Sequence, residues 1–266
     1  MLKFLIFAAA AAILLFIYIQ YIEKTGIFFP TKDIDFIPSD IGLEFKDIYF
    51  DTKDGLTLNG WFIPHQDSSL TLLFFHGNGG NISGRLDKIR ILHEAKVNIF
   101  IIDYRGYGRS QGVPTEKGVY IDSDSAYDYL TTKENVRAED IVIYGESLGA
   151  AVAVELAGRQ RAAGLILEGG FSSGRDIGKI IYPYLPKALL PNVLDSATRI
   201  EEITIPKLFI HSKDDEVVPI SLGKKLFSAA PVPKEFVEIT GLHDSGFRES
   251  QERYTSSIIG FIAKLK

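Results

Sequence analysis

The chain has 266 residues, of which 46% are hydrophobic, and a formal net charge of -5 at pH 7. This length fits one large α/β domain or two small ones, and an acidic balance without a long basic run argues against nucleic acid as the main partner. Because the chain contains no cysteine, disulfides, cysteine metal ligands, thiol nucleophiles and palmitoylation of this chain are excluded.

The N-terminal segment 2–22 is apolar apart from Lys3 and Gln20. As a helix rising about 1.5 Å per residue, it just spans a hydrocarbon core of about 30 Å. A cleaved signal peptide is the alternative, but no small-x-small cleavage site follows the apolar run. We therefore predict a single-pass membrane anchor over 1–24 and a folded domain over 25–266. The charges of Lys3 and the terminal amine favour a domain on the non-cytoplasmic side.

After a connector punctuated by proline and aspartate over 25–42, strand-like runs alternate with helical patterns. Asp54-Gly55 joins the first two runs in a predicted hairpin. The predicted strands are 45–50, 56–63, 70–75, 97–102, 141–144, 165–167, 208–210 and 236–239, and the predicted helices are 82–92, 119–130, 147–157 and 245–263. This alternation predicts an α/β fold with a mostly parallel sheet of about eight strands, helices on both faces, and the hairpin as an antiparallel edge.

Segment 171–202 interrupts the alternation. It carries prolines, leucines and the two tyrosines Tyr182 and Tyr184 between two predicted strands. One interpretation is a surface connection with a short helix. The other is a small lid whose apolar face lines a substrate pocket.

The pentapeptide Gly145-Glu146-Ser147-Leu148-Gly149 follows directly on a predicted buried strand and opens a predicted helix. G-x-S-x-G at such a corner is the nucleophile-elbow arrangement, in which the glycines permit close backbone contact in a strained turn and the serine hydroxyl projects above the sheet edge. A serine hydroxyl is a poor nucleophile until a base takes its proton, and the base needs a third group to fix its tautomer. Both partners are expected on later loops at the same edge of the sheet.

Two later loops supply candidates for the base and the acid. His243 follows the last predicted strand and is the predicted general base; a solvated loop histidine is the alternative. The acid is expected among Asp214, Asp215 and Glu216, which follow the preceding predicted strand. Asp215 is the preferred candidate and Asp214 the next, with Glu168 at the end of an earlier strand as an outside candidate.

The negative charge on a tetrahedral intermediate needs preorganised backbone N–H donors. One predicted donor is the N–H of Leu148, directly after the nucleophile. The other is expected from the glycine-rich turn 76–80, where we choose the N–H of Asn78, with Gly77 as the alternate. This turn lacks the Gly-Lys-Ser/Thr of a phosphate loop and the spacing of a dinucleotide site. No zinc-peptidase motif or complete calcium loop occurs, so we predict neither a cofactor nor a metal.

Several linked motifs together resemble the α/β-hydrolase superfamily, and especially its membrane-anchored subgroup of fungal bud-emergence-type proteins and animal α/β-hydrolase-domain proteins. The motifs are Phe28-Phe29-Pro30, Asp54-Gly55-Leu56, Gly60-Trp61-Phe62, the segments 76–81, 103–108 and 211–219, the elbow, and His243. The resemblance implies a triad of Ser147, Asp215 and His243 and an oxyanion hole from the Asn78 and Leu148 amides. Segment 103–108 is expected to lock loops together.

Two departures from the subgroup lie beside the site. Ala150 stands where a second glycine is usual after the elbow, and Asp244-Ser245 follows the histidine where Asn-Asp is common. Neither change touches a catalytic atom. Some animal relatives remove palmitate from proteins and are held at membranes by lipidated cysteines. This chain has no cysteine, so that substrate is not carried over.

The sequence thus predicts a membrane-anchored serine hydrolase that cleaves carboxylic esters or thioesters of acyl groups through an acyl-enzyme, with a lipid-like acyl ester as the substrate class. A serine peptidase on the same scaffold is the enzymatic alternative, which a panel of peptides against acyl esters would separate. A non-catalytic membrane scaffold is the third reading, and it would be favoured if a fluorophosphonate probe left Ser147 unlabelled.

Overall fold

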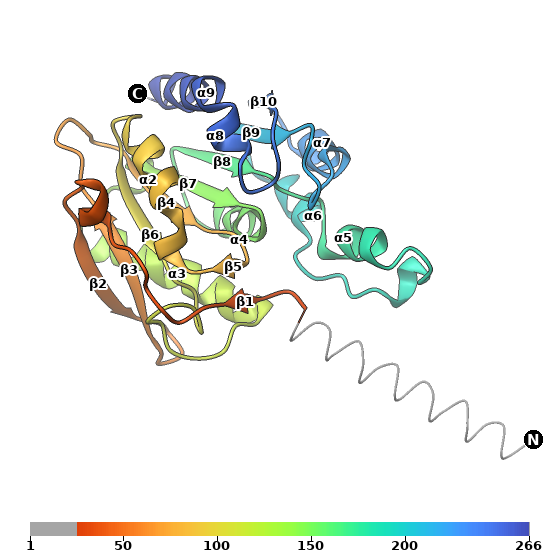
Figure 1. Ribbon diagram of the computed structural model, residues 1–266, viewed down its shortest axis with the longest axis horizontal. Helices are drawn as coiled ribbons and strands as arrows, with labels where there is room; N and C mark the ends of the chain where they lie inside the picture. Colours follow the sequence, from red (N-terminus) through yellow and green to blue (C-terminus); the bar gives the residue numbers. More distant parts are fainter. Residues whose placement is uncertain (1–25, 266) are drawn as a thin grey trace, which may run out of the picture.

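A computed structural model describes residues 26–265 of the chain. The strands are β1 (Phe29–Pro30), β2 (Lys46–Asp51), β3 (Thr57–Ile63), β4 (Thr71–Phe75), β5 (Gly79–Gly80), β6 (Asn98–Ile102), β7 (Ile141–Glu146), β8 (Gly164–Glu168), β9 (Lys207–Ser212) and β10 (Lys234–Ile239). Eight of them form one sheet in the order β10-β9-β8-β7-β4-β6-β3-β2 (Figure 1). Only β3 runs antiparallel to its neighbours, β2 and β6. The predicted mostly parallel sheet with an antiparallel hairpin at one edge is confirmed.

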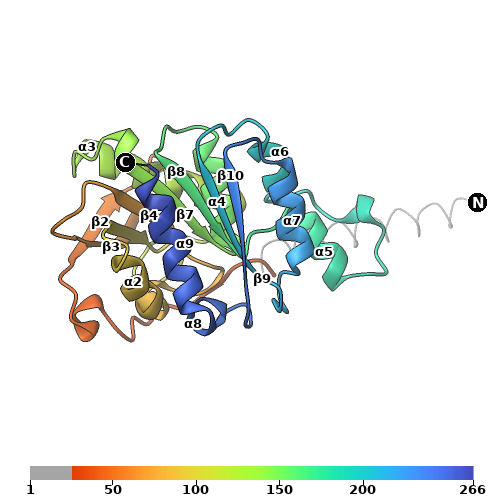
Figure 2. The same ribbon diagram turned by 90° about the horizontal axis from the view of Figure 1, so that it is seen from above.

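Helices cover both faces of this sheet. They are α2 (Leu86–His93), α3 (Glu116–Thr132), α4 (Leu148–Ala157), α5 (Gly174–Ile181), α6 (Ser196–Ile200), α7 (Ile220–Ala229), α8 (Gly246–Glu249) and α9 (Gln251–Ala263). Apolar side chains of α2 and α9 pack in one buried cluster, and those of α3, α4 and α7 pack in another. Figure 2 shows α2 and α9 on one side of the strands and α4 on the other. The central strands read as continuous apolar runs because both of their faces are buried.

A second, two-stranded sheet was not predicted from the sequence. In it, β1 pairs in parallel with β5, so that Phe29 lies opposite Gly79 and Pro30 opposite Gly80. Two-residue strands in a proline-containing connector and a glycine-rich turn have no alternation of apolar residues that could predict them. The pairing fixes the start of the described chain against the turn that follows β4.

Two further elements differ from expectation. Helix α7 was not predicted, and the last predicted helix is two helices that meet at Ser250. Segment 171–202 contains α5, a short 3-10 turn at Lys187–Leu189, and α6.

Within residues 26–265, no helix is long and apolar enough to cross a bilayer. The predicted anchor over 1–24 lies outside the described residues.

Candidate active site

Ser147 lies at the tight corner between β7 and α4, as the sequence predicted. Its backbone has φ 52° and ψ -114°, a conformation that costs a non-glycine residue on the order of 1–3 kcal/mol. A side chain at Gly149 would overlap the backbone oxygens of Phe75 and His76, and one at Gly145 would overlap the backbone of Gly149. Both glycines are therefore required for close backbone packing. A hydrogen bond of 2.8 Å from Ser147 N–H to the Glu168 carbonyl holds the corner.

The structure brings Ser147, His243 and Asp215 together from three different loops. Nε2 of His243 lies 2.9 Å from Oγ of Ser147, and Nδ1 of the same ring lies 2.7 Å from Oδ2 of Asp215. The other carboxylate oxygen of Asp215 accepts hydrogen bonds from the N–H groups of Val217 and Val218, at 3.0 and 2.7 Å. These bonds aim Oδ2 at the imidazole. The arrangement can move a proton from the serine hydroxyl to the ring.

The other acidic candidates have different partners. Asp214 accepts a hydrogen bond from the backbone of Gly241 at 3.2 Å, and Glu216 accepts one from the backbone N–H of His243 at 2.9 Å. Glu168 binds the buried Lys88 at 2.9 Å. Of the four carboxylates considered in the sequence analysis, only Asp215 makes a hydrogen bond to the His243 ring.

The contact between His243 and Asp215 shifts the pKa values of both side chains. Burial alone would lower the pKa of His243, but the hydrogen bond and negative charge of Asp215 outweigh it and raise the pKa above its usual value. Burial would likewise raise the pKa of Asp215, and the hydrogen bond from His243 reverses this and lowers it. The carboxylate therefore stays ionised and stabilises a protonated imidazole, which a proton-transfer role needs.

A second histidine, which the sequence analysis did not assign to the site, lies against Asp215. His211 is buried, and its Nε2 lies 2.8 Å from the Val218 carbonyl oxygen and 3.5 Å from Oδ2 of Asp215. Burial lowers the pKa of His211, which favours the neutral ring. Nε2 donates to the Val218 carbonyl oxygen, because a carbonyl oxygen can only accept. His211 thereby fixes the loop that carries Asp215.

The two residues predicted to supply oxyanion donors, Asn78 and Leu148, line one pocket together with Ser147. Leu148 is the first residue of α4, and Asn78 lies in the oxyanion loop, residues 77–81, whose Gly77 approaches the Cβ of Ser147. Among residues 26–265, neither the Leu148 nor the Asn78 N–H donates a hydrogen bond. Both amides are thus available to an external acceptor.

The oxyanion loop is held by hydrogen bonds on both of its sides. The Asn78 carbonyl accepts from the Tyr107 hydroxyl at 2.7 Å and from Phe29 N–H at 3.1 Å, while the Asn78 side chain donates to the Ile27 carbonyl at 3.0 Å. Segment 103–108 therefore connects loops, as expected from the sequence, and β1 contributes as much from the other side.

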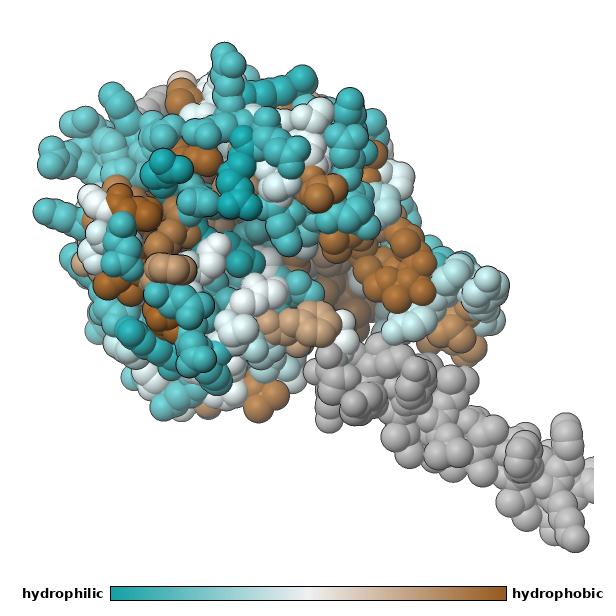
Figure 3. Space-filling model, viewed as in Figure 1, coloured by the Kyte–Doolittle hydropathy of each residue, from teal (hydrophilic) through white to brown (hydrophobic). Residues whose placement is uncertain are grey.

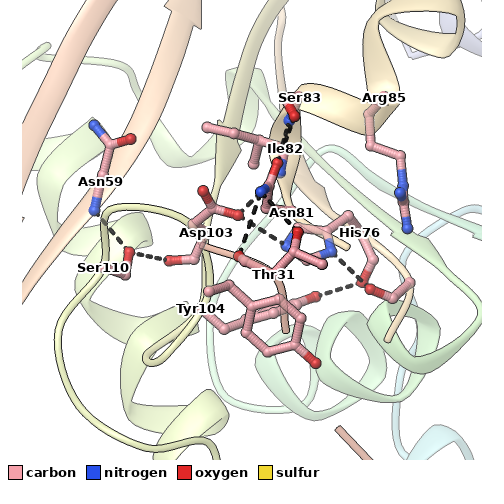
Figure 4. Close-up of polar contacts among 12 residues, drawn as sticks. Thr31, Asn59, His76, Asn81, Ile82, Ser83, Arg85, Asp103, Tyr104 and Ser110 are labelled. Carbon is pink, nitrogen blue, oxygen red and sulfur yellow. Dashed lines mark hydrogen bonds and ion pairs between the residues drawn. The ribbon is translucent and has the colours of Figure 1, made fainter. Parts of the chain in front are cut away.

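Figure 4 shows the polar contacts around the end of this loop. The Asn81 side chain donates to Oγ1 of Thr31 at 2.9 Å and to the Asp33 carbonyl at 2.6 Å. Asp103 accepts from Ile82 N–H at 2.9 Å, and the Tyr104 hydroxyl donates to the His76 carbonyl at 2.9 Å. The loop is thus tied at each end to segments distant in sequence, which keeps the Asn78 amide in place.

Two pockets of different character share Ser147, Asn78 and Val217 in their walls. The first, of about 450 Å³, is polar. Its charged lining residues are Arg85, Asp87, Lys88, Glu146, Asp244 and Arg248. The second, of about 370 Å³, is apolar. Its apolar walls come mainly from segment 171–202, with Phe171, Ile177, Ile181, Tyr182, Leu190 and Val193. Segment 171–202 therefore forms most of one wall of this pocket.

A buried ionic cluster lies directly behind the nucleophile. Lys88 is only 2% exposed and bridges Glu146 at 3.1 Å and Glu168 at 2.9 Å. Arg85 binds the other oxygen of Glu146 at 3.1 Å. The Tyr144 hydroxyl donates to Glu168, and the Tyr254 hydroxyl does so at 2.9 Å. Within the described part of the chain, no group of His, Asp or Glu side chains is placed to hold a metal ion.

Comparison with known proteins identifies related sequences and folds. A family model described as "Serine aminopeptidase, S33" matches residues 66–197. The α/β hydrolase domain-containing protein WAV2 of Arabidopsis thaliana is 32% identical over 88% of this chain and 83% of its own length. Protein bem46 of Schizosaccharomyces pombe is 36% identical over 68% of this chain and 64% of its own length. The esterase Pf2001 of Pyrococcus furiosus has the same fold, with a TM-score of 0.75 and 19% identity over 90% of this chain and 98% of its own.

Proposed function

The chain belongs to the α/β-hydrolase family, and we propose that it is a serine hydrolase that cleaves carboxylic ester or thioester bonds of acyl substrates through an acyl-enzyme. The observation that carries the proposal is the continuous chain of two hydrogen bonds from Ser147 through His243 to Asp215, at 2.9 and 2.7 Å. It begins at a serine held in a strained conformation by the surrounding backbone.

In the proposed reaction, Oγ of Ser147 attacks the substrate carbonyl carbon while Nε2 of His243 takes the hydroxyl proton. Asp215 accepts the hydrogen bond from Nδ1–H and stabilises the imidazolium that forms. The N–H groups of Asn78 and Leu148 donate to the oxygen of the tetrahedral intermediate. Collapse of the intermediate breaks the bond to the leaving alcohol or thiol, which receives the proton from Nε2. Water then attacks the acyl-enzyme in the same way and releases the acid.

The two pockets support a binding mode in which the acyl part and the leaving group of the substrate, which meet at the scissile bond, occupy different pockets. The apolar pocket matches an acyl chain, because Ile177, Ile181 and Leu190 offer it no hydrogen-bonding side chain. The polar pocket, which contains Arg85 and Asp244, matches a hydrophilic leaving group. Together with the apolar segment 2–22 predicted to anchor the protein, this favours lipid-like acyl esters.

Hydrolysis of p-nitrophenyl esters of graded chain length by the full chain tests the proposal. We expect Ser147→Ala to lower kcat by more than about 10⁴-fold with an unchanged circular dichroism spectrum. Ser228→Ala, which removes an exposed hydroxyl on α7, is the matched control and should retain full activity. Equal turnover by wild type and Ser147→Ala, or failure of a fluorophosphonate probe to label Ser147, would leave the scaffold interpretation as the better one.

An aminopeptidase is the second candidate, favoured by the description of the matching family model. An aminopeptidase needs a carboxylate that binds the α-amine of its substrate, and Asp244 lines the polar pocket beside His243. Aminoacyl p-nitroanilides measured beside the acyl esters separate the two candidates. Faster turnover of the anilides, lost in Asp244→Asn, would favour the peptidase.

A further inference from the structure

Exposed apolar side chains gather on segment 171–202 and form what we call the lid rim. The lid rim consists of Ile180, Ile181, Tyr182, Tyr184 and Leu189, which are 46%, 62%, 36%, 98% and 41% exposed. Figure 3 shows an apolar patch at this end of the molecule. In Figures 1 and 2, α5 and the chain that follows it project from the body of the domain. Contiguous exposed apolar surface of this kind marks an interaction site.

The lid rim continues into the mouth of the apolar pocket. Ile181 and Tyr182 belong to the lid rim and also line that pocket, and so do Gly26, Ile27 and Phe29 at the start of the described chain. Phe29 is itself 54% exposed. One continuous apolar area is therefore formed by the lid rim, the mouth of the apolar pocket and the first described residues of the chain.

The anchor predicted from the sequence over 1–24 indicates which partner could cover this area. Residues 2–22 have the composition of a bilayer-spanning helix, and Gly26 lies only two residues beyond the predicted anchor, a distance of at most about 7 Å in an extended chain. A bilayer that holds the anchor is thus within reach of the lid rim. We propose that the lid rim docks on the surface of this bilayer, so that the apolar pocket opens toward the membrane.

The chemistry of the lid rim fits a lipid–water interface. Tyrosines are enriched at that depth because an apolar ring carries a polar hydroxyl, and Tyr182 and Tyr184 supply two. Isoleucine side chains provide the apolar area that interfacial binding requires. Opening of the pocket toward the membrane rests on the proposed function, whereas docking itself is independent of catalysis.

Site-specific fluorescence in the full-length chain tests docking directly. The chain has no cysteine, so Tyr184→Cys or Ile180→Cys carries a single environment-sensitive label. Ile259→Cys on α9 is the matched control, because Ile259 is 43% exposed and Ile180 46%. In phosphatidylcholine–phosphatidylglycerol vesicles with spin-labelled lipid, we expect a blue shift and strong quenching at 180 and 184 and neither at 259. Equal quenching at 180 and 259 would overturn the proposal. So would a label response at 184 that follows protein concentration without lipid, because a second copy would then cover the lid rim.

A second measurement asks whether docking delivers substrate. Neither Tyr184 nor Ile180 lines either pocket, so Tyr184→Asp and Ile180→Asp each place a charge on the lid rim without changing a pocket residue. We expect each to lower turnover of a long-chain ester embedded in vesicles by about tenfold, since burial of one apolar side chain has about that effect on an equilibrium. Turnover of a soluble short-chain ester should not change, and Ile259→Asp should change neither. Equal losses on both esters would refute delivery by docking. If the wild type hydrolyses neither ester, the proposed function fails while the quenching result, obtained equally in Ser147→Ala, still decides docking.

Discussion

Removal of the buried Lys88 ammonium is expected to destabilise the domain strongly. Lys88→Met preserves most of the side-chain volume but leaves Glu146 and Glu168 without the cation that lies 3.1 and 2.9 Å from them. Breaking a buried ionic contact by removing one partner costs about 3–5 kcal/mol. Arg85 still neutralises Glu146, whereas Glu168 keeps only tyrosine donors, so the larger part of the cost falls on Glu168. For a domain of this size, such a loss lowers Tm by about 10 °C.

Urea unfolding of single and double variants measures this cost. In Lys88→Met/Glu168→Gln the uncompensated charge is gone, so the double variant should be more stable than the sum of the two single effects by about 1–3 kcal/mol. Lys264→Met, which removes an exposed lysine paired with Glu235, is the control and should cost less than about 1 kcal/mol. An effect of Lys88→Met no larger than that of Lys264→Met would refute the reasoning, as would strict additivity with Glu168→Gln.

The loss of stability in Lys88→Met should depend on pH. Burial alone would raise the pKa of Glu146, but Lys88 and Arg85 outweigh burial and hold it well below its usual value. A carboxylate with a lowered folded-state pKa contributes stability above its unfolded pKa of about 4.5 and loses that contribution as the pH falls. Without Lys88 the folded-state pKa rises. The stability difference between wild type and Lys88→Met should therefore be largest where Glu146 is ionised in both folded proteins, and it should narrow as the pH falls below the raised pKa of Glu146 in the variant.

Three further outcomes are expected. Ester turnover should rise with pH through a midpoint above about 6.5, the ordinary histidine pKa, because only neutral His243 accepts the serine proton and its pKa is raised. Asp215→Asn should move this midpoint to lower pH and lower kcat by about 10³–10⁴-fold. A midpoint that stays in place in this variant would contradict the role of Asp215. Gly149→Ala should destabilise the fold by at least about 2 kcal/mol in thermal unfolding because its Cβ overlaps backbone oxygens of two residues, whereas Gly260→Ala, with open space around it, should be neutral or stabilise by up to about 1 kcal/mol. Tyr107→Phe, which removes the 2.7 Å hydrogen bond to the oxyanion loop, should lower kcat about fivefold with KM unchanged; an effect confined to KM would place Tyr107 in substrate binding instead.

The sequence predicted the parts of the site that depend on local signals. A strand followed by G-x-S-x-G gives the position of Ser147, and the rule that parallel strands end at one edge brings the loops with Asp215 and His243 to it. Sequence analysis preferred Asp215 to Asp214 without a physical reason, and the family resemblance agreed with that preference. Only the structure shows why: the Val217 and Val218 amides fix Oδ1 of Asp215 and leave Oδ2 for the imidazole.

Other features depend on contacts between segments distant in the chain. Lys88 lies in an amphipathic helix, where a lysine normally faces solvent, and nothing near it in sequence indicates its two buried partners. The β1–β5 pairing joins segments 49 or more residues apart through backbone hydrogen bonds, which carry no side-chain signal. Helix α7, in contrast, could have been found, because Pro219 directly precedes it and proline is common at helix starts.

The β1–β5 sheet sets a limit on how the protein can be shortened for purification. A recombinant form that starts at Gly26 keeps every backbone contact between 27–33 and the loop with Asn78, whereas one that starts at Ile34 loses the bonds to Ile27, Phe29 and Thr31 at a single cut. The eight-stranded sheet does not use those residues. A version cut at Ile34 keeps the eight strands of the large sheet but loses the buried Phe28 side chain and the hydrogen bonds that hold Asn78. Weak activity of such a sample would therefore be a consequence of the truncation.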